Sequence, residues 1–347
     1  MRGLRKFLTP FAPDQSGAVS VLFELGGIVV ICDAGGCTGN VCGFDEPRWF
    51  EQKSAIFSAG LRDMDAILGR DDRLVAKLAD VVQKIDATFV AVIGTPVPAV
   101  IATDYLALKR MSEKKIKLPI LTVDTDGMEL YDKGEEKAFL ELFRTFAVEK
   151  YPVDEHRIGI LGMTPQDVSD LDAADKIRDL YQQKYGKQAV CYCMGDGLEE
   201  IREASSVSRN IVVSPAALMT AKYLEKTFGT PYEIHYPLVD ELIPDVDYTG
   251  KEVLIVHQQV IANSIRKELL KKGAKRVQIA SWFMMKKELL ADGDVLLRDE
   301  DAYIELVQNR DFDIIFADGC MERMIPEFKG IFVDTRHFAV SGKLIGK

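Results

Sequence analysis

The chain has 347 residues, 47% of them hydrophobic and 28% charged, which is typical of a well-packed soluble protein of two or three domains. Its net charge of −10 argues against non-specific nucleic-acid binding, which needs a basic surface. No uncharged apolar run approaches the roughly 18 residues of a membrane span, and the start, MRGLRKFLTPFAPD, lacks the apolar core of a signal peptide. We therefore expect a cytoplasmic protein with no nucleic-acid or membrane partner.

Short apolar runs alternate with amphipathic stretches along the whole chain. Ten of the runs are expected to be strands: residues 27–33, 87–95, 118–125, 157–163, 188–194, 210–215, 251–258, 276–282, 313–319 and 330–336. They are almost continuously hydrophobic, as strands covered on both faces are. Residues 71–85, 172–186 and 262–273 have helical periodicity; the first begins on Asp71 and Asp72, and the third ends on Gly273. This alternation predicts an α/β fold of doubly wound, mostly parallel sheets.

Two polar segments, residues 149–157 and 238–252, interrupt the alternation, and each is followed by a new strand. We expect three Rossmann-like units at 1–150, 151–240 and 241–347, with ligands beyond the carboxyl ends of their strands. The sequence contains neither G-x-x-x-x-G-K-[ST] nor G-x-G-x-x-G after a strand. We therefore expect that this chain binds no nucleotide.

Cys32, Cys37 and Cys42 follow the first expected strand in the segment ICDAGGCTGNVCG, with C-x4-C-x4-C spacing. Iron–sulfur clusters are held by thiolates on irregular, Gly-rich backbone whose amides can point at sulfur, and the loop around Gly36 suits this chemistry. The C-x2-C pairs of structural zinc sites are absent here. The alternative for Cys32 is that it ends a buried strand as a small hydrophobic residue.

The other three cysteines are weaker candidates. Cys191 and Cys193 lie two apart on an expected strand, so they should share one face as buried core thiols. Cys320 follows the strand at 313–319, where a cleft ligand can lie. No C-x-x-C pair is present to supply the attacking and resolving thiols of a thiol oxidoreductase.

Several segments, in order, resemble the component 1 proteins of nitrogenase and their relatives. They are SGAVSVLFELGGIVVICDAGGC (16–37), LRDMDAILGRDDRLVAKL (61–78), TFVAVIGTPVPAVIATDYLAL (88–108), VDTDGMELYDKGEEKAF (123–139) and NIVVSPAALMTAKYLEKTFGTPY (210–232). The resemblance covers nearly the whole chain and implies that Cys37 matches the family's cluster-binding cysteine. Cys32 stands where the family usually has His.

The departures from the family pattern argue against nitrogenase itself. No cysteine precedes Cys32, Pro96 stands at or next to another cluster ligand, and Ser214 falls where nitrogenase holds its iron–molybdenum cofactor. One chain offers Cys37 with Cys42 or Cys32, which is too few thiolates for a [4Fe–4S] cluster. A two-fold homodimer presents the same segment twice and supplies four. The resemblance thus implies a [4Fe–4S] cluster at a dimer interface, in a protein that works under anaerobic conditions.

By the same resemblance, an ATP-dependent iron protein would pass electrons to this chain, which would reduce a small molecule or a tetrapyrrole. Two other functions stay open at this point. The protein could be a scaffold for metal-cofactor assembly, which binds a metal species without turnover. It could also be a metal-free sensor or ligand-binding protein, because hinged Rossmann-like units also suit closure around a ligand.

The sequence leaves the catalytic residues undetermined. His257 and His337 follow expected strands and could face a cleft, although a packed His257 and a surface His337 are the ordinary alternatives. Asp124 and Asp126 follow another strand and could handle a proton or serve as turn and cap residues. Met284 and Met285 beside Trp282 are expected to be core residues or to line an apolar pocket.

Overall fold

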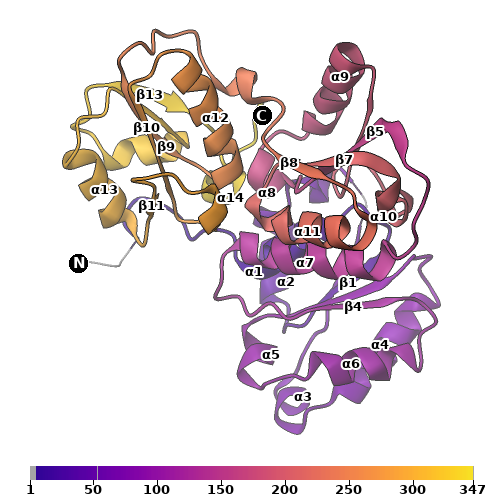
Figure 1. The fold of residues 1–347 in the computed structure, drawn as a ribbon. Helices are drawn as coiled ribbons and strands as arrows, with labels where there is room; N and C mark the ends of the chain where they lie inside the picture. The colour runs from indigo at the N-terminus through magenta and orange to yellow at the C-terminus, as the bar shows by residue number, and fades with distance from the viewer. Residues whose placement is uncertain (1–4, 53, 347) are drawn as a thin grey trace.

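The structure is a computed structural model that describes residues 5–52 and 54–346. It is an α/β fold with three parallel sheets, shown as three groups of strands in Figure 1. The strands are β1 (Ile28–Ile31), β2 (Ala55–Ser58), β3 (Val90–Ile93), β4 (Ile120–Val123), β5 (Asp154–Leu161), β6 (Gln188–Cys191), β7 (Val207–Val212), β8 (Tyr232–Ile234), β9 (Glu252–Val256), β10 (Arg276–Ser281), β11 (Val295–Leu296), β12 (Ile314–Ala317) and β13 (Ile331–Asp334). All ten expected strands are present, and the predicted α/β fold with parallel sheets is confirmed.

The strand orders are β2-β1-β3-β4, β6-β5-β7-β8 and β11-β10-β9-β12-β13, and every named pairing is parallel. In each sheet the chain begins at an inner strand and adds neighbours on both sides, which is double winding. β2, β8 and β11 were not expected from the sequence, and each lies at the edge of its sheet. None of the described helices is long and apolar enough to cross a membrane.

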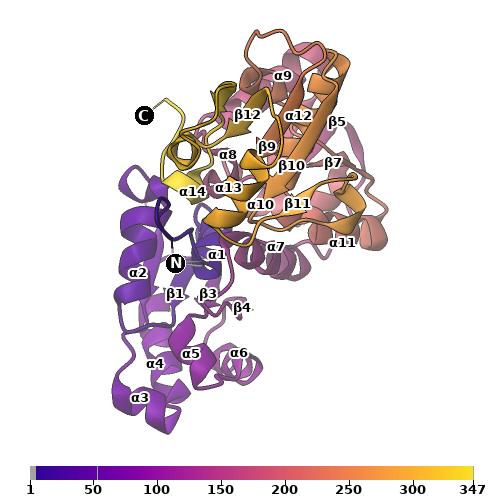
Figure 2. The ribbon, with the colours of Figure 1, turned by 90° about the vertical axis from the view of Figure 1, so that its left-hand side faces the viewer.

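The helices lie between and around the sheets (Figures 1 and 2). They are α1 (Asp14–Leu22), α2 (Gly36–Asn40), α3 (Asp63–Leu68), α4 (Asp71–Val82), α5 (Pro96–Val100), α6 (Tyr105–Glu113), α7 (Tyr131–Phe146), α8 (Pro165–Val168), α9 (Ala173–Tyr185), α10 (Leu198–Arg202), α11 (Leu218–Phe228), α12 (Gln259–Lys271), α13 (Glu300–Gln308) and α14 (Phe338–Ser341). The three expected helices correspond to α4, α9 and α12. Gly273, after α12, has a φ of 91°, the left-handed conformation that ends many helices.

The two faces of the first sheet pack into different cores because side chains alternate along a strand. On β1, Val29 and Ile31 face a core that includes α1, α7 and residues of the second sheet. Ile28 and Val30 face a separate core under α4 and α6. Apolar burial on both faces stabilises these strands and explains why they are uniformly hydrophobic.

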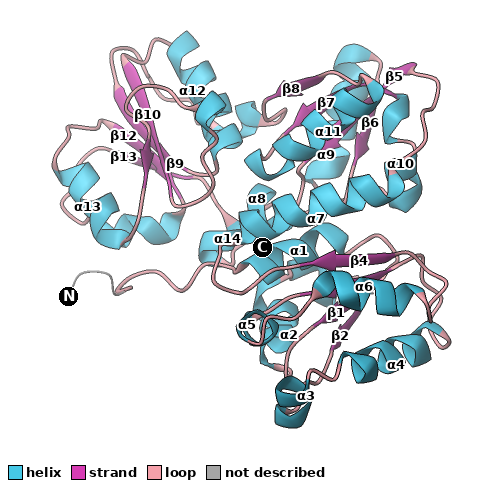
Figure 3. Ribbon diagram, turned by 60° about the horizontal axis from the view of Figure 1, so that its bottom comes forward, coloured by secondary structure: helices cyan, strands magenta, loops and turns pink. Residues whose placement is uncertain are grey.

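Helices α1 and α7 lie between the first and second sheets, as Figure 3 shows, and their backbones approach closely. Gly17 and Gly134 allow this approach: a Cβ on Gly134 would lie 1.7 Å from the carbonyl oxygen of Asp14, and one on Gly17 would lie 1.9 Å from that of Tyr131. Neither clash can be relieved without separating the two helices, because the obstructing atoms belong to the backbone.

We expect Gly134→Ala to destabilise the protein by up to about 2 kcal/mol. Overpacking costs about 1–3 kcal/mol, and the roughly 1 kcal/mol by which Ala exceeds Gly in helix propensity offsets part of that cost. Urea unfolding measures the change. Gly39→Ala in α2 is the matched control, since its added Cβ meets nothing within 4 Å. Equal stability of the two variants would contradict this account of the helix crossing.

The N-terminal segment packs on the third sheet unit rather than on the first. The Glu300 carboxylate accepts hydrogen bonds from the backbone N–H of Lys6 at 2.7 Å and of Leu8 at 2.7 Å. Phe11 packs against Trp282 and Phe283. The segment therefore connects the first and third units, and the unit boundaries at 150 and 240 stay a prediction.

Candidate functional site at the junction of the three sheets

The switch points of the three sheets all contribute to one junction. They lie between β1 and β3, between β5 and β7, and between β9 and β12. Beyond the first pair, Thr95 Oγ1 donates to the carbonyl of Cys32 at 2.6 Å. The switch points of the second and third sheets meet where Gln258 Nε2 donates to the carbonyl of Val213 at 2.7 Å. Crevices beyond the carboxyl ends of strands at such points are where ligands bind.

The cysteine segment begins at the first of these switch points. Gly35, with a φ of 120°, turns the chain into α2, and Asp33 fixes the start of that helix. The Asp33 carboxylate accepts hydrogen bonds from Thr38 N at 2.7 Å, Thr38 Oγ1 at 3.0 Å and Ser58 Oγ at 2.6 Å. The expectation of an irregular loop is wrong here, because α2 continues directly into a π turn at Val41–Asp45.

The structure separates the three loop cysteines into two environments. Cys32 continues the face of Ile28 and Val30, is only 2% exposed, and packs in the core under α4. Cys37, in α2, and Cys42, in the π turn, are half-buried and pack against the core on the other face of the sheet. Cys37 and Cys42 therefore pack against a common core, whereas Cys32 packs in a different one.

All three thiols are in surroundings that favour the neutral form. Burial, followed by the charges of Asp71 and Asp33, raises the pKa of Cys32 to about 12. Burial, followed by Glu46 and Asp33, raises the pKa of Cys42 to about 11, and burial also raises the pKa of Cys37. These are poor nucleophiles without a cation, whereas a bound metal ion would itself deprotonate them. Within residues 5–52 and 54–346, no group of three or more His, Cys, Asp or Glu could hold a metal ion.

The remaining cysteines lie elsewhere. Cys191 and Cys193 are both fully buried, as expected for core thiols, but the prediction that they share a face is wrong. Cys193 lies beyond the end of β6 with a φ of 67°, so the strand alternation does not reach it, and the two thiols pack in different cores. Cys320 is half-buried and packs against the core of the third unit.

A cavity of about 720 Å³ lies beside the cysteine segment, where parts of the three units meet. It is lined by Thr9–Pro13 of the N-terminal segment, Asn40, Gly43–Asp45 of the π turn, Gly127, Gln166 of α8, and Phe338–Gly342. We call this cavity the cleft. Its polar side chains are the carboxamides of Asn40 and Gln166, the carboxyl of Asp45 and the hydroxyls of Thr9 and Ser341. Gly43, which follows Cys42 in the sequence, is part of the wall of the cleft, so the cysteine segment borders the cleft.

Behind the cleft, a chain of buried polar groups joins the three units. The hydroxyl of Tyr131 donates to Asp167, and its oxygen lies 2.8 Å from Nε2 of His337. His337 stacks on His257 with ring centroids 4.3 Å apart and planes inclined by 10°. Asp167 and His337 each adjoin a residue of the cleft wall, Gln166 and Phe338. The group is therefore adjacent in sequence to the cleft wall at two points.

The candidate histidines are both buried. His337 is 1% exposed, so the alternative of a surface histidine is wrong. His257 accepts a hydrogen bond at Nδ1 from Gln258 N at 2.8 Å and lies 3.2 Å, through Nε2, from the carbonyl oxygen of Arg336. Burial and the neighbouring His337 lower the pKa of His257 to about 3. His257 is consequently neutral, with its proton on Nε2.

The other candidates are peripheral to this junction. Asp124 is exposed and pairs with Lys137 at 3.2 Å. Asp126 caps the following turn by accepting from Met128 N at 2.8 Å. Met284 is buried, and Trp282 packs at the edge of the third core.

Sequence reasoning did not single out Tyr131, Glu135, Gln166 or Asp167. A signal was available for the last two, since MTPQD directly follows an expected strand and contains Thr-Pro, a common helix start. Tyr131 and Glu135 lie on an amphipathic helix, where nothing in the local pattern separates them from core and surface positions.

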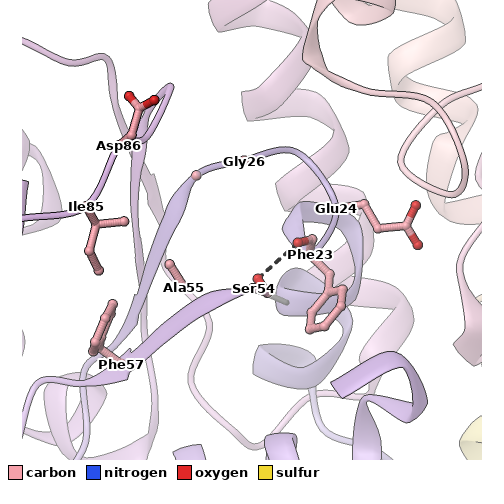
Figure 4. A pocket seen from close by; sticks show the side chains of 9 residues that line it. Phe23, Glu24, Gly26, Ser54, Ala55, Phe57, Ile85 and Asp86 are labelled. Atoms are coloured by element: carbon pink, nitrogen blue, oxygen red, sulfur yellow. Dashed lines mark hydrogen bonds between the residues drawn. The ribbon is translucent and has the colours of Figure 1, made fainter. Parts of the chain in front are cut away.

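A second cavity, of about 490 Å³, lies at the opposite end of the first sheet (Figure 4). It is lined by residues that precede the strands, including Gly26, Ser54 and Asp86, and Ser54 Oγ donates to the carbonyl of Phe23 at 3.0 Å. Because it lies at the amino ends of the strands, the switch-point rule does not favour it as a ligand site.

Comparisons with known proteins agree with the fold. A family model described as nitrogenase component 1 type oxidoreductase matches residues 14–240. The nitrogenase iron-molybdenum cofactor biosynthesis protein NifE of Clostridium pasteurianum is 28% identical over 180 residues, covering 51% of this chain and 38% of that protein. NifE of Bradyrhizobium diazoefficiens is 22% identical over 185 residues, covering 51% of this chain and 32% of that protein. The matches therefore span well under half the length of these relatives.

Among solved structures, nitrogenase Cp1 at pH 6.5 superposes with a TM-score of 0.71 at 12% identity, covering 96% of this chain and 87% of that one. Nitrogenase Cp1 at pH 5 gives a TM-score of 0.70 at 14% identity, covering 96% and 84%. At this level of identity the likeness shows a common fold.

Proposed function

The chain belongs to the nitrogenase component 1 type oxidoreductases, and from this premise we propose that it is a homodimeric iron–sulfur oxidoreductase. Cys37 and Cys42 of two chains would together hold one [4Fe–4S] cluster, and the cleft beside them would receive the molecule to be reduced. When bound, such a cluster accepts and passes on single electrons.

The observation that carries the proposal is that Cys37 and Cys42, beyond the first switch point, share an environment from which Cys32 is separated. Both thiols are half-buried and pack against the same core, and they are half of the four thiolates that a [4Fe–4S] cluster needs. Cys32 is buried on the opposite face, so the structure favours Cys42 over Cys32 as the second ligand. Gly36, the first residue of α2, leaves the backbone open beside Cys37.

Exposed apolar side chains on the first unit support dimerisation. Phe44 is 76% exposed, Val100 85% and Met128 82%. Phe44 and Gly127 line the same cleft, and Gly127 lies against Pro96 at the start of α5. Apolar groups gathered in this way on a protein surface commonly mark an interface. A second copy of the chain would cover them and bring two cysteine segments together.

Electrons would come from a separate ATP-dependent iron protein, in keeping with the absence of a nucleotide motif from this sequence. The substrate would be a small molecule with little negative charge. The cleft offers carboxamides, hydroxyls and the carboxyl of Asp45 to a ligand. These groups suit a neutral hydrogen-bonding molecule better than a tetrapyrrole that carries several carboxylates.

A second candidate function is that of a scaffold for metal-cofactor assembly. It is favoured by the match to two proteins named for nitrogenase iron-molybdenum cofactor biosynthesis. A scaffold would bind a metal species and release it to an acceptor without consuming reductant. A metal-free sensor is the third alternative, and it requires Cys37 and Cys42 to remain free thiols.

Anaerobic purification with iron and sulfide analysis tests the proposal. We expect a brown dimer with about four irons and four sulfides per two chains, since each chain supplies two thiolates. Mass measurement in solution should give twice 38.7 kDa. A colourless dimer that resists reconstitution would exclude the cluster. The scaffold function would be favoured by a different result: the protein retains iron but does not consume a low-potential reductant when candidate substrates are added.

A further inference from the structure

Glu135, on α7, is a carboxyl group sealed in the interior with an incomplete set of hydrogen bonds. Its relative exposure is 0%. Oε1 accepts a hydrogen bond from Thr164 Oγ1 at 2.5 Å, and no described residue is a partner for Oε2. A carboxylate charge in such a place is unfavourable, because a single neutral hydroxyl does not replace the water that burial removes.

The charges around Glu135 reinforce this effect. The ionisable groups that face it are Tyr131 and Asp132 on α7, Asp167 on α8, Arg48, and Cys193 beyond β6. Arg48 is already paired with Glu46 and Glu24, so it does little to balance Glu135. Burial, and next the charge of Asp167, raise the pKa of Glu135 well above its usual value, while the Thr164 hydrogen bond opposes the shift.

Glu135 is also linked to the cleft through its hydrogen-bond partner. Its partner Thr164 is the N-cap residue of α8, and Gln166, two residues later, lines the cleft. The oxygen of the Gln166 side chain is buried and has no partner among the described residues, as is also true of Oδ2 of Asp167. The segment from Thr164 to Asp167 therefore links the hydrogen-bond partner of Glu135 to the cleft wall and carries two unpaired acceptor atoms.

We propose that Glu135 is neutral at physiological pH and that its proton exchanges with the cleft, where it is available to a ligand that is being reduced. The use of the proton rests on the proposed function, whereas the protonation and its exchange do not. Glu135 thereby acts as a buried proton store for the cleft.

A ligand reduced by two electrons takes up two protons, and the electrons come from the low-potential iron protein of the proposed function. One of the two protons comes from solvent through the cleft, and the other leaves Oε2 of Glu135 as a new bond to hydrogen forms on the ligand. The electron pair of the broken O–H bond stays on the carboxylate, which then regains a proton from solvent through the cleft.

Infrared spectroscopy of the metal-free wild-type protein tests the proposal without any variant. A protonated buried carboxyl group gives a carbonyl band separate from those of carboxylates. We expect this band at pH 7, and we expect it to shift soon after transfer of the folded protein into D₂O. Absence of the band would overturn the proposal. A band that shifts only when the protein unfolds would also overturn it, because such a proton cannot reach the cleft.

Unfolding as a function of pH provides the second measurement. The folded pKa of Glu135 lies above its unfolded value, so the folded state binds one more proton between the two values, and stability falls as pH rises through that window. Relative to Glu135→Gln, the wild-type unfolding constant should rise by up to tenfold per pH unit above about pH 5. Glu141→Gln, on the same helix and half-exposed beside Lys109, is the matched control and should keep the wild-type pH dependence.

Each outcome separates the two proposals. A pH dependence that is the same for wild type and Glu135→Gln would show that the buried carboxyl is not the proton carrier. If Glu135→Gln fails to fold, the infrared bands of the wild type still decide the matter. Both measurements use the metal-free chain, so they stand even if no cluster is ever found.

Discussion

We expect Cys37→Ala to abolish cluster binding: if anaerobic reconstitution gives the proposed content of about four irons per dimer of the wild type, it should give almost none of the variant. The proposed dimer would then retain only the two Cys42 thiols for the cluster, and two thiolates do not hold four irons. Cys42→Ala should have the same effect for the same reason. Iron and sulfide content, with the absorption spectrum, measure both variants.

The control variants follow from the environments of the other cysteines. Cys320→Ala changes a half-buried thiol in the third unit and should keep full iron content. Cys32→Ala should also keep its iron, because Cys32 packs in the core on the opposite face of the first sheet. Iron retained by Cys37→Ala, or lost from Cys32→Ala, would require a different ligand set.

The parts of the fold that follow from sequence are those with a strong local cause. Inner strands such as β1, β3 and β9 are continuously apolar because both of their faces are covered, and that composition is visible in a single sequence. The edge strands β2, β8 and β11 were missed because they are short and partly exposed. Their sequences, AIFS, YEI and VL, become strands through pairing with a neighbour, which no local pattern reveals.

The cysteine segment shows how far the sequence leads towards a site. Spacing placed Cys32, Cys37 and Cys42 after a strand, and resemblance selected Cys37, but neither could separate Cys32 from the other two. The separation depends on strand alternation, which carries Cys32 to the α4 face of the sheet. The helical form of the segment was missed because it depends on Asp33 accepting from Thr38 and Ser58.

The group behind the cleft was beyond reach of the sequence for a different reason. Tyr131 and His337 are 206 positions apart, and Asp167 comes from a third segment, so only the complete fold brings the three together. His337 looked like a surface residue because it lies in a polar stretch, VDTRHFAVSG. Its burial comes from α8 and α14, where Phe338 N donates to Ser169 Oγ at 2.7 Å.

Removal of the Arg48 side chain should give the largest loss of stability, about 3–5 kcal/mol for Arg48→Ala. Arg48 is 1% exposed and donates to both oxygens of Glu46 at 2.7 Å, to Glu24 at 2.8 Å and to the carbonyl of Ser20 at 2.7 Å. Without it, the buried Glu46 keeps a charge that no cation balances. Urea or thermal unfolding measures the change.

Arg73→Ala provides the control, since Arg73 pairs with Asp65 but its side chain is 57% exposed, and such pairs contribute about 0–1 kcal/mol. A similarly small loss of stability in Arg48→Ala would mean that the Glu46 carboxylate can be solvated in place.

The Arg48–Glu46 ion pair is also linked to the proposed cluster. The Glu46 N–H donates to the carbonyl of Val41 at 2.9 Å and so closes the π turn that carries Cys42. We therefore expect Arg48→Ala to lower the iron content at temperatures where the variant is still folded, whereas Arg73→Ala should leave it unchanged.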